Sequence, residues 1–395
     1  MKKMDFDLIV VGGGPAGAAA AKAAVEEGLA ILLIEKKTIP RAKPCSGYIF
    51  REAGRFLEDH YGELPDEVRS TPRHVRKVRL YLDKDKFVEV AEQGQSVWRD
   101  KLDQWLCKAS GAEVWDRSRM LDFCEWGDYV EVVCTRDGKK VRLRARALVA
   151  ADGGMSQIRK RIDPGFLEGV PCIAAKHEYH HCDADLEPGI FNVFMNAEYG
   201  VYPAAYFKDD LLVIDTSVRT GNKLGPPCEA FHGMLARDFG FKSRGLSARF
   251  GCMVAFPSIL NRFCFGTNRV LVAGEAAGFM NALGEGISSA LATGYLAGKA
   301  VAEKAGAPPG PLYRERVKPE RARTAREWSL PAMMTGRSRP AFKEALFSLR
   351  IPDILRVTRA MMAWQLAGGV APGLQKDDIE VLFRKLLHRS YDFRS

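Results

Sequence analysis

A glycine-rich loop near the start of the chain has the pattern of a phosphate-binding turn. Residues 12–17 are Gly-Gly-Gly-Pro-Ala-Gly, between an apolar stretch and an alanine-rich one. Such glycines let the backbone approach a pyrophosphate, and the amino end of the following helix attracts negative charge. Glu35, after the next apolar stretch, can accept hydrogen bonds from ribose hydroxyls. The pattern predicts a dinucleotide site formed by Gly12, Gly14, Pro15, Ala16, Gly17, Glu35 and Lys36.

A second motif follows an apolar stretch in the middle of the chain. Ala151-Asp152-Gly153-Gly154, with Ser156 and Arg159 close behind, resembles the Asp-Gly motif of flavoprotein hydroxylases. In those proteins the acidic residue helps to position the pyrophosphate of FAD. The resemblance therefore makes Asp152 a candidate cofactor-binding residue, and the alternative is a simple Asp-Gly turn.

A third motif, at residues 269–278, resembles the Gly-Asp motif of the same flavoproteins. Glu275 follows Gly274 where the family has an aspartate, so an acceptor is kept but its reach differs. Gly286 and Ile287 are expected to place backbone amides near the flavin pyrimidine edge, where reduction leaves negative charge. The alternative for these two residues is close helix packing by small side chains.

Within these flavoproteins the chain most resembles the geranylgeranyl reductases, FAD enzymes that saturate isoprenoid double bonds. Residues 43–47, Lys-Pro-Cys-Ser-Gly, are similar to that family's Lys-x-Cys-Gly-Gly loop, with Ser46 in place of a glycine. Arg99 and Asp103 resemble the spacing that opens the family's next helix, where the arginine faces FAD. The resemblance implies FAD as the cofactor and adds Cys45, Ser46, Gly47, Arg99 and Met120 to the cofactor-binding candidates.

Residues 200–209 fall where geranylgeranyl reductases usually have an aromatic stretch with a tryptophan. The tryptophan and one proline are missing here, which indicates a substrate different from the best-known isoprenoids. Tyr202, Tyr206 and Phe207 still predict an aromatic wall for an elongated apolar substrate. Cys45 and Tyr206 are the candidate catalytic residues, although Cys45 also fits the role of a small buried filler.

The function implied by the resemblance is that of an FAD-dependent reductase. It would saturate carbon–carbon double bonds of an isoprenoid or polyprenyl lipid or of a quinone-type substrate. An FAD-dependent aromatic monooxygenase is the main alternative, and a non-enzymatic flavin-binding electron-transfer protein is the second. No second Gly-x-Gly-x-x-Gly unit supports a separate NAD(P)H domain, and the electron donor is open between NAD(P)H and ferredoxin.

Composition limits the location and the partners of the chain. Lys and Arg outnumber Asp and Glu by 59 to 49, which suits an anionic membrane surface or a phosphorylated substrate, or is a solvated face. Nucleic-acid binding is not expected, because no recognised module accompanies the charge. The apolar runs are far shorter than the roughly 20 residues of a membrane-spanning helix. We expect a cytoplasmic protein, with peripheral contact to a membrane surface left open.

The histidines and cysteines do not predict a metal site. His177, His180, His181 and Cys182 stand on one predicted strand, where neighbouring side chains point to opposite faces. The nine cysteines form no Cys-x-x-Cys pair and suit a reducing compartment. No metal is therefore expected.

Apolar periodicity predicts the elements that position these motifs. Strands at 6–11 and 30–35 enclose a helix at 15–27, a loop at 40–47 precedes a helix at 101–108, and a hairpin turns at Asp137-Gly138 before a strand at 145–151. Stretches at 172–179, 190–195, 200–207 and 211–218 predict an antiparallel sheet, and 341–349 and 379–387 predict amphipathic helices.

The expected fold class is α/β, a Rossmann-like FAD-binding domain with an inserted antiparallel β-sheet substrate domain and a helical C-terminal region. The FAD-binding domain is assigned to residues 1–165 and 251–305, the substrate-facing sheet to 166–250 and the helical region to 306–395.

Overall fold

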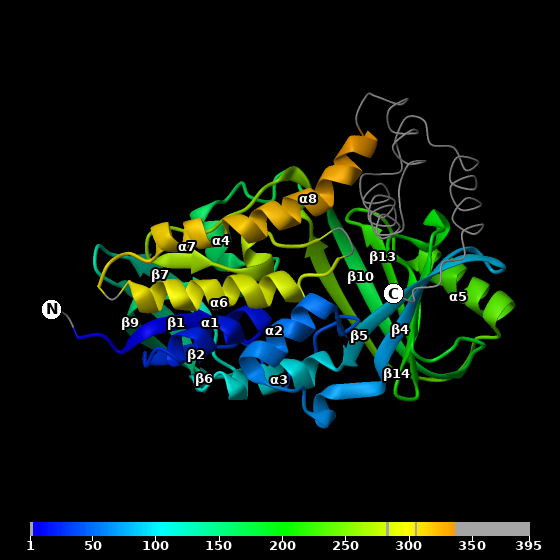
Figure 1. Ribbon diagram of the computed structural model, residues 1–395, viewed down its shortest axis with the longest axis horizontal. Coiled ribbons are helices and arrows are strands. Elements are labelled where there is room, and N and C mark those ends of the chain that lie inside the picture. The colour runs from blue at the N-terminus through cyan, green and yellow to red at the C-terminus, as the bar shows by residue number, and fades with distance from the viewer. Residues whose placement is uncertain (1–2, 282–283, 305, 336–395) are drawn as a thin grey trace, which may run out of the picture. The chain divides into compact units, whose positions relative to one another are not determined.

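The computed structural model describes residues 3–281, 284–304 and 306–335 (Figure 1). These residues form two compact units, each described here by itself. Unit 1 contains residues 3–69, 97–170 and the described part of 255–325, and unit 2 contains 70–96, 171–254 and 326–335. The helices expected at 341–349 and 379–387 lie outside the described residues. The domain limits drawn from the sequence remain a prediction.

The elements of unit 1 come from three separate stretches of chain. Its strands are β1 (Phe6–Val11), β2 (Ile31–Ile34), β3 (Tyr48–Ile49), β6 (Glu113–Trp115), β7 (Met120–Glu125), β8 (Val130–Arg136), β9 (Lys139–Ala150) and β15 (Val270–Val272). Its helices are α1 (Pro15–Val25), α2 (Arg51–Tyr61), α3 (Arg99–Ala109), α4 (Gln157–Ile162), α6 (Ile287–Glu303), α7 (Gly310–Arg316) and the first part of α8 (Lys318–Thr335). Short 3-10 helices are η1 (Asp66–Val68), η3 (Pro257–Leu260) and η4 (Gly274–Ala277).

The sheet of unit 1 runs in the order β6-β2-β1-β9-β8-β7, with β15 also paired to β9. β6, β2, β1, β9 and β15 are parallel, whereas β8 is antiparallel to both β9 and β7. Leu8, Val10 and Leu33 share one buried cluster with residues of α1, α3 and α6. The α/β fold class and the strand–helix–strand opening are confirmed, because β1, α1 and β2 occupy the expected places.

One strand of unit 1 differs from the expectation. The hairpin turns at Asp137 and Gly138, both with positive φ, as its sequence predicts. Residues 145–151 do not form a separate strand, because β9 continues from Lys139 to Ala150. Its first part alternates in burial and pairs with β8, and its last four residues are fully buried and pair with β1. Because burial changes along this one strand, its sequence has the pattern of two separate strands.

Helices α1 and α6 lie side by side in unit 1 with their backbones in contact (Figure 1). A Cβ atom added at Gly294 would lie 2.0 Å from the carbonyl oxygen of Ala16, and one added at Gly298 would lie 2.2 Å from that of Ala20. Alanines on α1 and glycines on α6 therefore allow an approach that larger side chains would prevent. This packing anchors the helix that follows the glycine-rich loop.

Unit 2 is built on a second sheet. Its strands are β4 (Arg69–Asp83), β5 (Lys86–Val97), β10 (Cys172–Asp183), β11 (Ile190–Phe194), β12 (Ala204–Lys208), β13 (Leu211–Arg219) and β14 (Lys242–Ala255), with η2 (Ala197–Tyr199) and helix α5 (Gly225–Phe239). They run in the order β14-β10-β13-β12-β11-β4-β5. The pairs β10–β13, β13–β12 and β12–β11 are antiparallel as expected, and β11 pairs in parallel with β4.

Helix α5 covers one face of this second sheet. Phe231 and Leu235 of α5 pack with Phe194, Leu212 and Ile214 of the strands. Among the described residues, none of the helices combines the length and the apolar character needed to cross a bilayer. All nine cysteines lie in the described residues, and each is a free thiol.

Candidate functional site

The glycine-rich loop of unit 1 is held closed by Glu35 at the end of β2. Glu35 is 5% exposed, and its Oε2 accepts a hydrogen bond from the Gly13 amide at 2.9 Å while Oε1 accepts one from Lys37. Gly12 has φ +115°, and a Cβ there would lie 2.2 Å from the Ala151 carbonyl oxygen. Gly17 is equally constrained, because its Cβ would lie 1.9 Å from the Gly12 carbonyl oxygen. These glycines are required by close backbone contact.

Gly14 differs from its neighbours in the loop. It precedes α1, whose first residues are Pro15 and Ala16, and its φ of −101° suits any residue. Among the described residues outside its immediate neighbours, an added Cβ would meet within 4 Å the tip of the Arg41 side chain alone, at 3.2 Å. The amino end of an eleven-residue helix is therefore open to an anion at this point. A backbone cradle with open space above it fits the pyrophosphate of a dinucleotide.

Arg41, which sequence analysis did not select, joins two buried carboxylates. Its Nε lies 3.4 Å from Glu35 Oε2, and its Nη2 lies 2.8 Å from Asp103 Oδ2. Asp103 is 1% exposed and also accepts hydrogen bonds from the Arg99 guanidinium at 3.0 to 3.2 Å. Glu35, Arg41, Asp103 and Arg99 thus form one continuous buried charge network. The only sequence signal for Arg41 was the basic composition of residues 40–47.

Cys45 lies at the end of this network. Burial alone would raise the pKa of its thiol, but the Arg99 guanidinium, the Gly47 amide and Lys43 together lower the pKa below its ordinary value. The Gly47 amide donates to the sulfur at 3.4 Å. Arg99 is held by Asp103 on one side and interacts with the thiol on the other. The structure therefore brings together Cys45, Arg99 and Glu35, which the sequence had selected from separate motifs.

The second and third motifs meet across the sheet of unit 1. The Gly154 amide donates to Glu275 Oε2 at 3.2 Å, and Arg159 donates to the carbonyl oxygens of Gly154 and Ala276. Asp152 accepts from the Gln157 amide, and burial raises the pKa of its carboxyl. The glutamate at the usual aspartate position therefore reaches the Asp-Gly loop. The motifs form one connected structure at the ends of β9 and β15.

Gly286 lies directly before α6, and Ile287 is the first residue of that helix. Glu285 Oε1 accepts from the Ser288 amide at 2.7 Å, and Asn281 Oδ1 accepts from the Glu285 amide. Burial raises the pKa of Glu285. A Cβ added at Gly286 would lie 3.3 Å from Met280 Cε, and Gly294 and Gly298 are the glycines of α6 that pack against α1. The amino end of α6 is thus a second helix terminus that suits negative charge.

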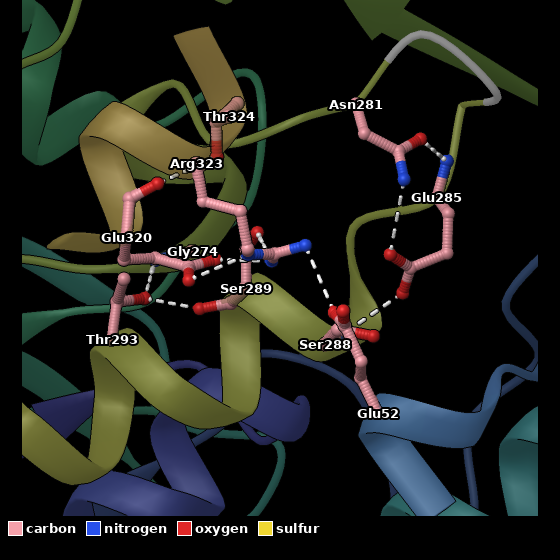
Figure 2. A network of polar contacts seen from close by, with 10 residues as sticks. All are labelled: Glu52, Gly274, Asn281, Glu285, Ser288, Ser289, Thr293, Glu320, Arg323 and Thr324. Atoms are coloured by element: carbon pink, nitrogen blue, oxygen red, sulfur yellow. Dashed lines mark hydrogen bonds and ion pairs between the residues drawn. The ribbon is translucent and has the colours of Figure 1, made fainter. Parts of the chain in front are cut away.

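Figure 2 shows how α8 fixes the start of α6 through Arg323. The Arg323 guanidinium donates to Glu52 of α2 at 2.9 Å and to Ser289 of α6 at 3.1 Å. One turn further along, Thr293 Oγ1 accepts from the Gly274 amide at 2.9 Å. Arg323 is one of the excess basic residues for which a solvated face was one interpretation of the sequence. Here that side chain connects three helices.

Four further cofactor-binding candidates, Lys36, Met120, Ser46 and Gly47, also lie in unit 1. Lys36 is exposed directly after β2, and Met120 begins β7 and packs against the apolar cluster on that side of the sheet. Ser46 Oγ accepts from the Tyr48 amide. The positive φ of this loop, +65°, belongs to Gly47, so a serine at position 46 costs no backbone strain.

The substrate candidates of unit 2 do not share one face. Tyr206 donates a hydrogen bond to Asp215 at 2.9 Å and stacks on Phe191. Its neighbour Phe207 packs with the cluster beneath α5, on the other face of the sheet. Tyr202 precedes β12 with φ +56°, and burial raises its pKa well above the ordinary value.

Among the described residues, one group of side chains has the donor types of a metal site. It consists of Glu178 and His180 of β10 and His232 of α5. The predicted alternation of His177, His180, His181 and Cys182 is present, since His177 pairs with Asp215 on the face away from α5. Sequence reasoning had not considered a donor from a separate helix.

Comparisons with known proteins identify the nucleotide-binding part. A family model described as an FAD binding domain matches residues 5–177. Digeranylgeranylglycerophospholipid reductase 2 of Methanopyrus kandleri is 32% identical over 214 residues, which span 52% of this chain and 51% of that protein. Digeranylgeranylglycerophospholipid reductase of Methanosarcina acetivorans is 26% identical over 318 residues, 75% of each chain. The first match thus covers about half the length of the relative.

The fold also matches a solved structure. A geranylgeranyl bacteriochlorophyll reductase-like protein of Thermoplasma acidophilum superposes with a TM-score of 0.73 at 19% identity, covering 96% of both chains. Together with the glycine cradle and the open helix terminus at Gly14, these matches make FAD the cofactor. The chain is therefore an FAD-binding flavoprotein related in sequence and fold to geranylgeranyl reductases.

Proposed function

We propose that the chain is an FAD-dependent reductase that saturates carbon–carbon double bonds of an isoprenoid or polyprenyl lipid or of a quinone-type substrate. The observation that carries the proposal is the match over 318 residues to a digeranylgeranylglycerophospholipid reductase. The charged network that ends at Cys45 supports it, because that network joins the reductase-like loop to the nucleotide-binding loop. Bound FAD supplies a hydride when it is reduced.

Different residues of unit 1 would bind different parts of FAD. The loop at Gly12 to Gly17 and the amino end of α1 would hold the pyrophosphate, and Glu35 would accept from the adenosine ribose. Gly286 and Ile287 stand at the amino end of α6, which would stabilise the negative charge of a reduced flavin.

Saturation of a double bond also needs a proton at the carbon next to the one that receives hydride. We assign this proton to the thiol of Cys45. Arg99 and the Gly47 amide, which together with Lys43 lower the pKa of the thiol below its ordinary value, would stabilise the thiolate that remains. Solvent then returns a proton to the sulfur. Tyr206, the other catalytic candidate, is committed to Asp215 as a donor.

The test uses FAD-loaded protein reduced without oxygen and mixed with a panel of polyprenyl alcohols, phosphates and quinones. A mass gain of two hydrogens is expected for at least one polyprenyl compound. In heavy water at least one of the two atoms should be deuterium, and Cys45→Ser should slow turnover while FAD stays bound. Oxygen-dependent hydroxylation of a small aromatic compound, without any polyprenyl reduction, would contradict the proposal and support a monooxygenase.

The electron donor and the membrane contact form a second part of the proposal. The net charge of +10 suits an anionic lipid surface, to which a polyprenyl substrate would be confined. Sedimentation with anionic vesicles at low salt, lost at high salt, is the expected result. Flavin reduction by NADPH or by reduced ferredoxin, followed at the flavin absorbance band, separates the two donors.

A further inference from the structure

Three side chains of unit 2 converge between a strand and the helix that covers it. Glu178 and His180 are two residues apart on β10 and therefore point to the same face of the sheet. Helix α5 packs on that face and directs His232 toward them. Each of the three has one possible ligand atom, and these atoms all lie within 4.8 Å of one another.

The geometry of the two histidines suits coordination. His232 Nε2 lies 3.1 Å from Glu178 Oε2. His180 Nδ1 lies 3.0 Å from Ser243 Oγ, whereas its Nε2 is buried without a hydrogen-bond partner among the described residues. A ligating histidine characteristically uses one ring nitrogen for the metal and the other for an orienting hydrogen bond. Ser243 provides such an orienting contact for His180.

The donor types of the three side chains also suit a metal ion. Imidazole nitrogens and carboxylate oxygens are ligands of Zn²⁺. Two imidazoles and one carboxylate form a donor set used by Zn²⁺ with a fourth position open.

Two cations approach the same carboxylate from other directions. Arg249 contacts Glu178 Oε1 at 2.8 to 2.9 Å and leaves Oε2 to the histidines. Lys176 Nζ lies 2.8 Å from Oε2, where it would compete with a metal ion. Lysine is flexible, and its side chain here is 20% exposed, so it can turn toward solvent. Arg249 would remain and orient the carboxylate.

We propose that Glu178, His180 and His232 bind a divalent transition-metal ion of the Zn²⁺ class, which ties α5 to β10. His232 is 31% exposed at its side chain, so an ion and a water ligand can enter from its side. Metal binding would stabilise the packing of the helix on the sheet.

The experiment measures Zn²⁺ binding to the full-length, FAD-loaded protein by competition with a chromophoric chelator. One Zn²⁺ per chain is expected for the wild type, and His232→Gln should lower the affinity by roughly 10–100-fold or more. His181→Gln is the matched control, since His181 stands on the same strand, is half exposed and pairs with Asp210 instead. Equal affinity of wild type and His232→Gln would overturn the proposal.

Lys176→Met gives a second and opposite test. Because the ammonium group competes for Glu178 Oε2, its removal should tighten Zn²⁺ binding and raise the unfolding temperature in the presence of Zn²⁺. If the cluster is only an ion-pair network, the same variant gains no metal affinity, and the proposal fails. Folding of each variant is checked by retained FAD and by circular dichroism.

Cobalt identifies the donor atoms. Co²⁺ bound to two imidazoles and a carboxylate gives weak visible bands without a thiolate charge-transfer band. Cys228 lies one turn before His232 on α5 and hydrogen-bonds Lys176. A strong thiolate band that disappears in Cys228→Ser but persists in His180→Gln would place the ion elsewhere and would refute this donor set.

Discussion

Replacing Asp103 by asparagine tests the buried charge network that connects Glu35 to Cys45. The carboxylate is 1% exposed and is shared by Arg99 and Arg41, whose side chains are 7% and 14% exposed. Asparagine keeps one carbonyl oxygen but removes the charge, which leaves two buried guanidinium groups without their common anion. Removing one partner of a buried ion pair costs about 3–5 kcal/mol. The lower end applies here, because Arg41 keeps Glu35 at 3.4 Å.

The assay is urea unfolding of the FAD-loaded protein, followed both by circular dichroism and by flavin fluorescence. Asp100→Asn is the matched control, since Asp100 lies in the first turn of α3, three residues before Asp103, and is only half-buried. Its loss should cost less than about 1 kcal/mol, the scale of a charge near a helix terminus. If Asp103→Asn stays within about 0.5 kcal/mol of this control, a difference too small for a buried charge, the network does not exist as described.

Four further substitutions test other contacts. Glu35→Arg should weaken FAD binding by roughly 1–3 kcal/mol, the scale of a lost or mispaired polar contact, and titration of the apoprotein with FAD measures it. Gly17→Ala should prevent folding because its Cβ would lie 1.9 Å from a carbonyl oxygen, whereas Gly14→Val should fold but lose FAD. Circular dichroism measures the folding and flavin absorbance the bound FAD. Full FAD occupancy of either variant would argue against placing the pyrophosphate at this loop. Burial opposes protonation of His177, but Asp215 raises its pKa to about 10. The stability that this pair contributes is present below the unfolded pKa of His177, about 6.5, and is lost as pH rises through about 10. Asp215→Asn should therefore reduce the dependence of the unfolding free energy on pH across that range.

The nucleotide-binding part could be predicted because its signals are local. The run from β1 through the glycine loop to α1 carries a strand, a turn and a helix within neighbouring residues, and each has its own sequence pattern. Glu35 follows from its spacing in the same pattern. Arg41 does not, because its two partners lie on β2 and α3 and only the folded chain brings them together.

The second unit was less predictable for physical reasons. Strand β4 has the sequence RSTPRHVRKVRLYLD, in which basic residues separate the apolar ones and buried positions such as Ser70, Val75 and Leu80 do not alternate. Helix α5 has glycine and two prolines at its start and alternating polar and apolar residues, so its periodicity is weak. Without α5, Glu178 and His180 lack His232, the third side chain of the cluster. A site assembled from two distant elements leaves no single motif to find.

The contact between α1 and α6 orders events during synthesis of the chain. α1 leaves the ribosome early, yet the glycines that receive its alanine face stand at positions 294 and 298. Until those residues emerge, the face of α1 that packs on α6 lacks its final cover, and β15, which completes the parallel strands beside β9, is also missing. Contacts so distant in sequence slow folding and expose apolar surface to aggregation. A fragment that stops before position 270 would therefore contain the complete glycine motif and still lack the partner that packs its helix in place.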